Sequence, residues 1–248
     1  MFKRLVVGAL FAGLFSGAIA AVIQLAFVVP LIHEGELYES GAVIHFGVAG
    51  SHEPPADATT AAPQIESDTK ADHDHAAHDH SDAPESLLTR GLGTFGFFLL
   101  SYTGFALFLV AAFAWAERAG HRITARSGVI WGLCGFLAVQ LAPAFGLPPG
   151  LPGGTSAPLD LRQIWWIGCV LATVAGIGLL AFGKTAIAIG SAVFLIAAPH
   201  LIGAPETPFG GVSPPELAAH FTARVLGAGA VCWILLGTIA GAIWAREA

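Results

Sequence analysis

The stretch LVVGALFAGLFSGAIAAVIQLAFVVPLI, from Leu5 to Ile32, contains no charged residue. About 20 apolar helical residues are enough to cross the ~30 Å hydrocarbon core of a bilayer. The whole chain shares this character, because 55% of its 248 residues are hydrophobic and only 11% are charged. Soluble domains carry about 25% charged residues. The sequence therefore predicts an integral membrane protein.

Six such blocks predict a single membrane domain, 1–248, built as an all-α polytopic bundle. The predicted helices cover about 5–32, 92–116, 128–145, 164–183, 185–203 and 222–245. Only Gly183 and Lys184 separate the fourth from the fifth. As one helix the two would run about 60 Å, twice the bilayer, so a hairpin of two spans is favoured. Five spans is the alternative, if residues 185–203, broken at Pro199, are re-entrant.

The distribution of basic residues predicts the orientation. Lysine and arginine concentrate in cytoplasmic loops, and a cytoplasmic N-terminus places seven of the eleven on that side. Both termini are then cytoplasmic, and we expect the membrane to be the bacterial inner membrane. The basic leader MFKR also gives the first block the look of a secretory signal, but the apolar run to Ile32 is too long for a signal core.

A polar segment from His33 to Gly91 interrupts the apolar pattern on the predicted outer side, and we expect residues 50–84 to be disordered. Within it, Asp72–His80 reads DHDHAAHDH, four histidines in nine residues. Imidazole with carboxylate suits Co²⁺, Ni²⁺ and Zn²⁺ better than Mg²⁺ or Ca²⁺. We interpret His73, His75, His78 and His80 as metal ligands. A merely solvating linker and a segment that charges near pH 6.5 are the alternatives.

A second set of polar residues lies close to the predicted membrane edge. Ionisable groups there are costly unless they are paired, solvated or functional. If the members of this set converge, they would form a metal site at the outer mouth of the bundle; each alone is more simply a satisfied interfacial residue. The candidate ligands are His33, Glu34, His200 and His220.

Other polar residues carry less information. Asp160 and Arg162 are expected to pair with each other or with the interface, and the role of Arg224 stays open. No Asp, Glu, Lys or Arg lies in the middle of a predicted span, and no GxxxxGK[ST] motif is present. Neither a proton relay nor a nucleotide site is therefore visible, so the energy source cannot be inferred.

Three motifs resemble a known family. They are LAPAFGLPPGLPG (Leu141–Gly153), DLRQIWW (Asp160–Trp166) and PHLIGAP (Pro199–Pro205). Together with the histidine-rich loop they resemble the CbtA family of predicted cobalt transporter subunits. The resemblance implies five or six helices, cobalt as the transported ion, a link to cobalamin supply, and a small single-span, histidine-bearing CbtB-like partner. The family usually has glutamate where this chain has Gly150, so no ligand is assigned there.

We therefore expect a cobalt transporter subunit in contact with membrane lipid, with no enzymatic activity, no organic cofactor and no nucleic-acid partner. Uptake is favoured because the chelating tract faces outward. Nickel or zinc transport is one alternative, and a non-transporting metal-sensing or scaffold subunit is another. A haem-binding oxidoreductase subunit is disfavoured, because His33, His200 and His220 all lie at one membrane face.

Overall fold

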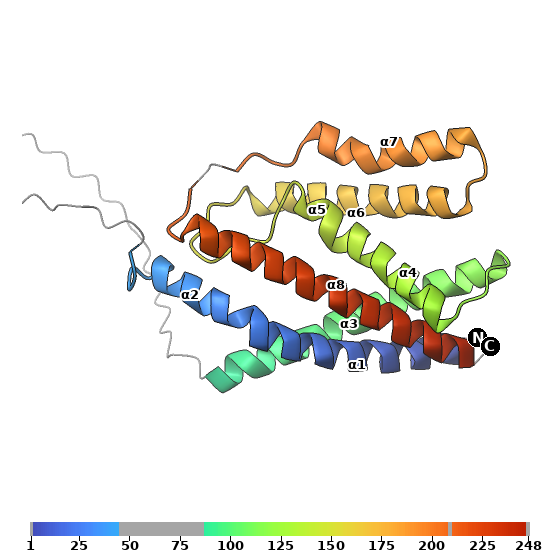
Figure 1. The fold of residues 1–248 in the computed structure, drawn as a ribbon, viewed down its shortest axis with the longest axis horizontal. Coiled ribbons are helices and arrows are strands. Elements are labelled where there is room, and N and C mark those ends of the chain that lie inside the picture. The colour runs from blue at the N-terminus through green and yellow to red at the C-terminus, as the bar shows by residue number, and fades with distance from the viewer. Residues whose placement is uncertain (1, 45–86, 208–209, 247–248) are drawn as a thin grey trace, which may run out of the picture.

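The computed structural model describes residues 2–44, 87–207 and 210–246. Residues 50–84, predicted to be disordered, and His73, His75, His78 and His80 within them lie outside these ranges. Apart from an isolated bridge between Gly154 and Gly211, the described elements are helices. They are α1 (Phe2–Phe27), α2 (Val29–Glu39), α3 (Leu87–Arg118), α4 (Ala125–Phe136), the π-helical turn η1 (Leu137–Leu141), α5 (Ala142–Ala144), α6 (Leu159–Phe182), α7 (Ala186–Ile202) and α8 (Pro215–Arg246) (Figure 1).

Five of the described helical segments are long and apolar enough to cross a membrane. They are Val6–Phe27, Thr89–Arg118, Ala125–Ala144, Leu159–Phe182 and Pro215–Arg246. Helix α7 is apolar but has only 17 residues, or about 25 Å of helix. It turns back at Gly183 and Lys184 and runs antiparallel to α6 (Figure 1). The predicted fold class, an all-α polytopic membrane protein, is confirmed.

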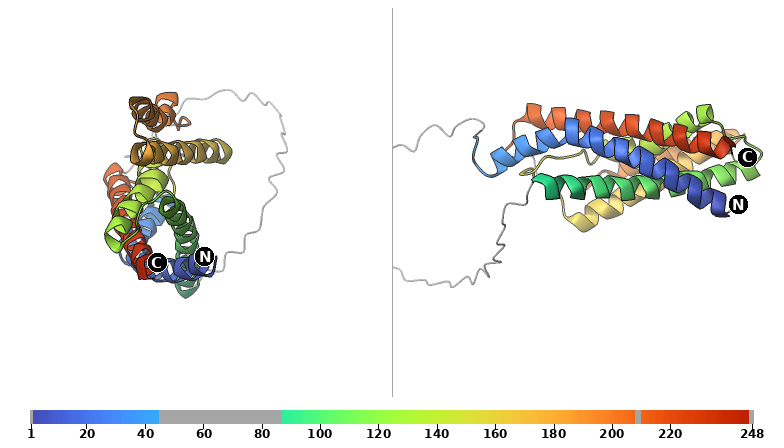
Figure 2. Two further views of the ribbon diagram at one scale, coloured as in Figure 1. Left: turned by 90° about the vertical axis from the view of Figure 1, so that its right-hand side faces the viewer. Right: turned by 90° about the horizontal axis from the view of Figure 1, so that it is seen from below.

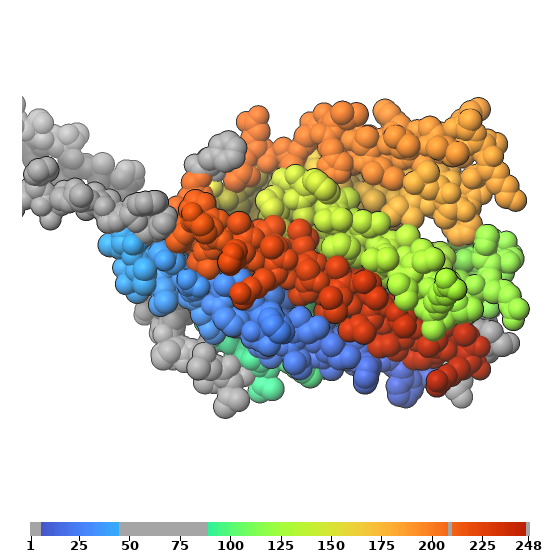
Figure 3. Space-filling view, viewed as in Figure 1, coloured from blue at the N-terminus to red at the C-terminus, as the bar shows by residue number. Residues whose placement is uncertain are grey.

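Four long helices, α1, α3, α4 and α8, form what we call the body. Helix α1 packs along α3, and α8 lies against both α1 and α4. The end-on view in Figure 2 shows the α6–α7 hairpin set to one side of this group. Figure 3 shows α4 and α5 between the hairpin and α8 on the facing surface. Among the described helices, α7 packs only on α6.

Glycine allows the body helices to touch backbone to backbone. A Cβ added to Gly128 of α4 would lie 2.2 Å from the carbonyl oxygen of Gly237 of α8, and one added to Gly13 of α1 would lie 2.4 Å from the Cα of Thr103 of α3. Such approaches are possible only without a side chain, which is why small residues mark helix interfaces in lipid. These glycines therefore set the distances between α4 and α8 and between α1 and α3.

The predicted helix 5–32 is in fact two helices. Helix α1 ends at Phe27, and α2 continues to Glu39. Pro30 has no N–H to donate, and the Leu31 N–H bonds the Val28 carbonyl at 3.0 Å, so the Phe27 carbonyl loses its helical partner. Arg224 of α8 supplies the missing donor, since its Nη1 lies 3.1 Å from the Phe27 oxygen. This contact answers the open question about Arg224.

Other predicted helix boundaries differ too, since α3 begins at Leu87 rather than at residue 92 and α6 at Leu159 rather than at residue 164. Helix α8 begins at Pro215 rather than at residue 222, because proline is favourable in a first turn and the added turns project beyond the apolar stretch. The predicted helix 128–145 contains η1, in which the Ala142 N–H bonds the Leu137 carbonyl. Pro143 follows and cannot donate, so the ordinary helical ladder is broken at this point.

Candidate functional site

One end of the molecule, which we call the loop end, carries α2, the loop 147–158 and the connection from α7 to α8. Both chain termini lie at the opposite end (Figure 1). His33 lies on α2, His200 near the end of α7, and His220 in the early turns of α8. Among the described histidines, only His121 lies at the other end, between α3 and α4. Three of the four described histidines therefore lie on elements at one end of the molecule.

The loop-end residues are not assembled into a coordination site. His33 is half-buried, whereas Glu34, His200 and His220 are exposed. Among the residues that the structure describes, no group of three or more His, Cys, Asp or Glu side chains is placed to hold a metal ion. The ligand roles of these four residues, and of His73, His75, His78 and His80, stay predictions.

Glu36 is engaged by an arginine and is not a free carboxylate. Arg90 in the first turns of α3 donates from Nη1 to Glu36 Oε2 at 3.3 Å and from Nη2 to Oε1, so the pair is bidentate. The hydrogen bond and charge of Arg90, with a smaller contribution from the charge of His33, hold the pKa of Glu36 below its usual value against the opposing effect of burial. This pair therefore joins α2 to α3, the two helices that precede and follow residues 45–86 in the chain.

His200 stands among aromatic rings. Its ring centroid lies 6.1 Å from that of Phe145 and 6.0 Å from that of Trp165, both in edge-on geometry. Trp165 Nε1 donates to the Pro199 carbonyl at 3.3 Å, and a Cβ on Gly146 would lie 2.6 Å from the Trp165 ring. The three motifs LAPAFGLPPGLPG, DLRQIWW and PHLIGAP therefore contact one another, a convergence that sequence reasoning missed.

The two proline-rich loops are joined over the loop end. Thr155 Oγ1 donates to the Gly210 carbonyl at 3.0 Å, and Thr222 Oγ1 donates to the Pro149 carbonyl at 3.0 Å. Leu151 is buried in a small cluster with residues of α2 and α8. A cavity of about 900 Å³ lies here, and its walls include the oxygen-bearing Glu39 and Ser40. The loops are thus held together over the loop end, beside a cavity whose walls are mainly apolar with a few oxygen-bearing side chains.

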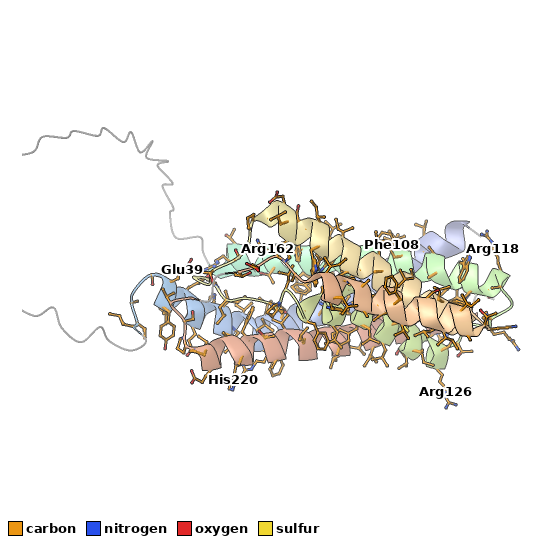
Figure 4. The ribbon with its side chains drawn as sticks, turned by 90° about the horizontal axis from the view of Figure 1, so that it is seen from above. Glu39, Phe108, Arg118, Arg126, Arg162 and His220 are labelled. Carbon is orange, nitrogen blue, oxygen red and sulfur yellow. The ribbon has the colours of Figure 1, made fainter. Side chains whose placement is uncertain are left out.

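The expected pairing of Asp160 with Arg162 does not form. Asp160 is exposed, and the Arg162 side chain makes no hydrogen bond or ion pair with a described residue, although its backbone N–H donates to the Pro158 carbonyl at 3.1 Å. The Arg162 Nε is buried without a partner. Figure 4 shows Arg162 toward the loop end with Glu39 and His220, whereas Arg118 and Arg126 lie at the other end.

Comparison with known proteins gives one result over nearly the whole chain. The family model described as "Probable cobalt transporter subunit (CbtA)" matches residues 2–245. The chain belongs to the CbtA family. The resemblance stated from the motifs is thereby confirmed, and the multi-pass helices agree with a family of membrane transporter subunits. Comparison with curated proteins and with solved structures found no match.

Proposed function

We propose that this CbtA chain carries Co²⁺, or a similar divalent ion such as Ni²⁺ or Zn²⁺, across the bacterial inner membrane without enzymatic chemistry. The observation that supports this most strongly is the match to the cobalt transporter subunit family over residues 2–245. Cobalt then serves cobalamin supply, and no organic cofactor takes part. The direction is uptake, with the loop end outside and both termini in the cytoplasm.

The proposed first step is capture by His73, His75, His78 and His80. Neutral imidazole nitrogens and the neighbouring carboxylates replace part of the water shell of the ion. A chain segment that must be ordered on binding loses about 1–2 kcal/mol of backbone entropy per residue, which favours labile binding and release over storage.

The proposed second step is transfer to the loop end, where His33, Glu34, His200 and His220 offer further nitrogen and oxygen ligands. Because the described residues form no complete metal site by themselves, the site needs further ligands to hold an ion. We assign part of this role to the proposed CbtB-like partner, a small single-span chain with histidine. The description of the family as subunits is consistent with such a partner.

Metal accumulation in cells tests the transport proposal directly. Cells that express the chain together with its proposed partner should accumulate more cobalt under limitation than cells without the chain, as measured by mass spectrometry of cell metal. Nickel and zinc added in competition would rank the selectivity. Equal cobalt content with and without the chain would rule out uptake.

Two deletions of equal length test the capture step. Removing residues 72–80 should lower uptake at scarce cobalt, with recovery at high cobalt, because the tract only concentrates ions. Removing residues 56–64, which contain no histidine, should leave uptake unchanged. Loss at every cobalt concentration would instead mean that the tract forms the translocation site.

Single substitutions test the loop-end ligands. His200→Ala and His220→Ala should each reduce the maximal rate of cobalt uptake, whereas His121→Ala, at the opposite end of the bundle, should not.

A reporter protein fused at residue 75, expressed in the same cells, would test the orientation of the chain in the membrane. A cytoplasmic reporter signal would reverse the assigned direction.

A non-transporting metal-sensing or scaffold subunit is the second candidate. It is favoured by one observation, the lack of an assembled metal group among the described residues. Reconstitution of the chain alone and with its proposed partner in liposomes separates the two. Cobalt flux with the chain present supports transport, whereas binding without flux in both preparations supports the sensor or scaffold.

A further inference from the structure

A groove runs between the hairpin and the body at membrane depth. It has a volume of about 770 Å³ and is lined by η1, α5, α6 and α7. The walls are apolar except for Thr173 and His200; the apolar side chains include Leu137, Leu141, Ile177 and Ile196. Cavities with such walls exclude water. A divalent ion would find too few nitrogen or oxygen ligands here to replace its water shell.

The groove follows one face of α6. Trp165, Thr173, Ile177 and Leu180 line it, and their spacings of eight, four and three residues place them on one helix face. From Trp165 to Leu180 the helix rises about 22 Å, more than the ~15 Å thickness of one leaflet's hydrocarbon. At the far end, Phe182 packs edge-on against Trp115, with ring centroids 4.7 Å apart. The groove therefore runs along most of α6, and the Phe182–Trp115 contact lies beyond its last lining residue on that helix, Leu180.

Arg162 lies toward the loop end of α6, about one helical turn before Trp165, which lines the groove (Figure 4). It lies three residues before Trp165, on the same face of α6. Its Nε is buried, and no described residue neutralises the guanidinium. The N-terminus of α6 also lacks a side-chain cap, although the Asp160 carboxylate in the same turn opposes an anion. A cation at the membrane interface next to an apolar groove is complementary to a phospholipid, whose phosphate is anionic and whose acyl chains are apolar.

We infer that the groove binds one acyl chain of a phospholipid whose phosphate accepts hydrogen bonds from the Arg162 guanidinium. Trp165 separates the two parts of the site, since its ring lines the groove and its indole N–H is already bonded to Pro199. The lipid fills a volume that would otherwise be empty or collapse, and it joins the hairpin to the body. This inference does not depend on which ion the chain carries.

Native mass spectrometry of the full-length chain in mild detergent tests the site. Dioleoylphosphatidylglycerol should bind one molecule per chain, and dioleoylglycerol, with the same acyl chains but no phosphate, should bind at least several-fold more weakly. Arg162→Gln should weaken phosphatidylglycerol binding about tenfold, the effect of losing a charge-assisted hydrogen bond. Its control is Arg126→Gln, an exposed arginine at the other end, which should bind as the wild type does.

A second variant tests the groove itself. Ile177→Trp fills the groove and should abolish retention, whereas Ile187→Trp, at an α7 position that is 82% exposed, should not. Equal binding of the two lipids, or wild-type binding by both Arg162→Gln and Ile177→Trp, would overturn the inference. A lipid-free dimer that phosphatidylglycerol cannot displace would overturn it as well, since a second copy would then occupy the groove.

Discussion

The packing within the body and the attachment of the hairpin to the body depend on different contacts. In the body, Gly128 and Gly237 bring α4 and α8 into backbone contact, whereas Gly168, Gly178 and Gly190 of the hairpin have no atom of another element within 4 Å of an added Cβ. The hairpin is attached instead through large rings, with Phe182 against Trp115 and Trp165 close to Gly146. Gly176 is the exception in the hairpin, since its added Cβ would lie 3.0 Å from the Ala192 carbonyl oxygen of α7. A glycine in a span therefore indicates close helix packing only where it faces another helix.

The largest expected effect comes from adding one methyl group to the body. Gly237→Ala would place its Cβ 2.2 Å from the Gly128 carbonyl oxygen and 2.7 Å from the Gly132 nitrogen. Neither backbone can yield without separating α4 from α8, so we expect a loss of about 3 kcal/mol in unfolding free energy. Denaturation by dodecyl sulfate, followed by tryptophan fluorescence or circular dichroism, would measure it.

Gly190→Ala in the hairpin is the matched control. Nothing lies within 4 Å of the added methyl group, and alanine favours a helix over glycine by up to about 1 kcal/mol. This variant should be as stable as the wild type or slightly more stable. If both substitutions had the same effect, the contrast between body and hairpin would be lost.

The second-largest expected loss of stability comes from a substitution at the break between α1 and α2. Arg224→Ala removes the donor that reaches the Phe27 carbonyl, and a hydrogen bond from a charged group contributes about 1.5–3 kcal/mol. We expect a loss near 2 kcal/mol in the same denaturation assay. Arg224→Lys, which keeps the charge but has a shorter reach and a single donor group, should recover only part. If Arg224→Ala were as stable as the wild type, water would be shown to replace the guanidinium as the hydrogen-bond donor to the Phe27 carbonyl.

These two sites differ in how far sequence could reveal them. Small residues at four-residue spacing, such as Gly237 and Gly241, can be recognised from sequence as packing positions. The contact of Arg224 cannot, because its acceptor is the Phe27 backbone carbonyl, which is left without a helical partner where α1 ends, 197 positions away in the sequence. Charge-free length likewise predicted the spans but not their ends, since α2 and the first turns of α8 extend past the apolar residues.

A smaller effect would test the attachment within the hairpin. Trp165→Phe keeps a ring next to His200 but removes the N–H that bonds the Pro199 carbonyl at 3.3 Å. The expected loss is about 1 kcal/mol, the usual contribution of a neutral hydrogen bond. Trp166→Phe, at the exposed neighbouring position, should change the unfolding free energy less. Equal losses would mean that the indole N–H contributes nothing specific.

For the candidate site, the sequence could predict at which end of the molecule the histidines lie, but not the distances between their side chains. The spacing of spans predicts that His33, His200 and His220 lie at one membrane face, and in the structure the helix ends that carry them lie at the same end of the molecule. Coordination depends on side-chain distances between separate helices, which no local pattern encodes, and the described residues form no metal group. The engagement of Glu36 by Arg90 was equally invisible, because the two residues lie 54 positions apart.

The smallest expected effect comes from this ion pair. The side chains of Arg90 and Glu36 are 46% and 32% exposed, so solvent screens them and the pair contributes only about 0.5 kcal/mol. Because the folded-state pKa of Glu36 is lowered by Arg90, this contribution is present above the ordinary carboxyl pKa and is lost as pH falls through the lowered value. Glu36→Gln should therefore be less stable than the wild type near neutral pH.

The difference between the two proteins should vanish once the pH has fallen below the lowered pKa of Glu36, where the carboxyl has taken up its proton. It should also shrink as salt is added, since both side chains are partly exposed. Glu34→Gln, the exposed neighbour on α2, should show neither dependence. A stability difference that persists in acid would mean that glutamine disturbs the packing of α2 rather than the ion pair.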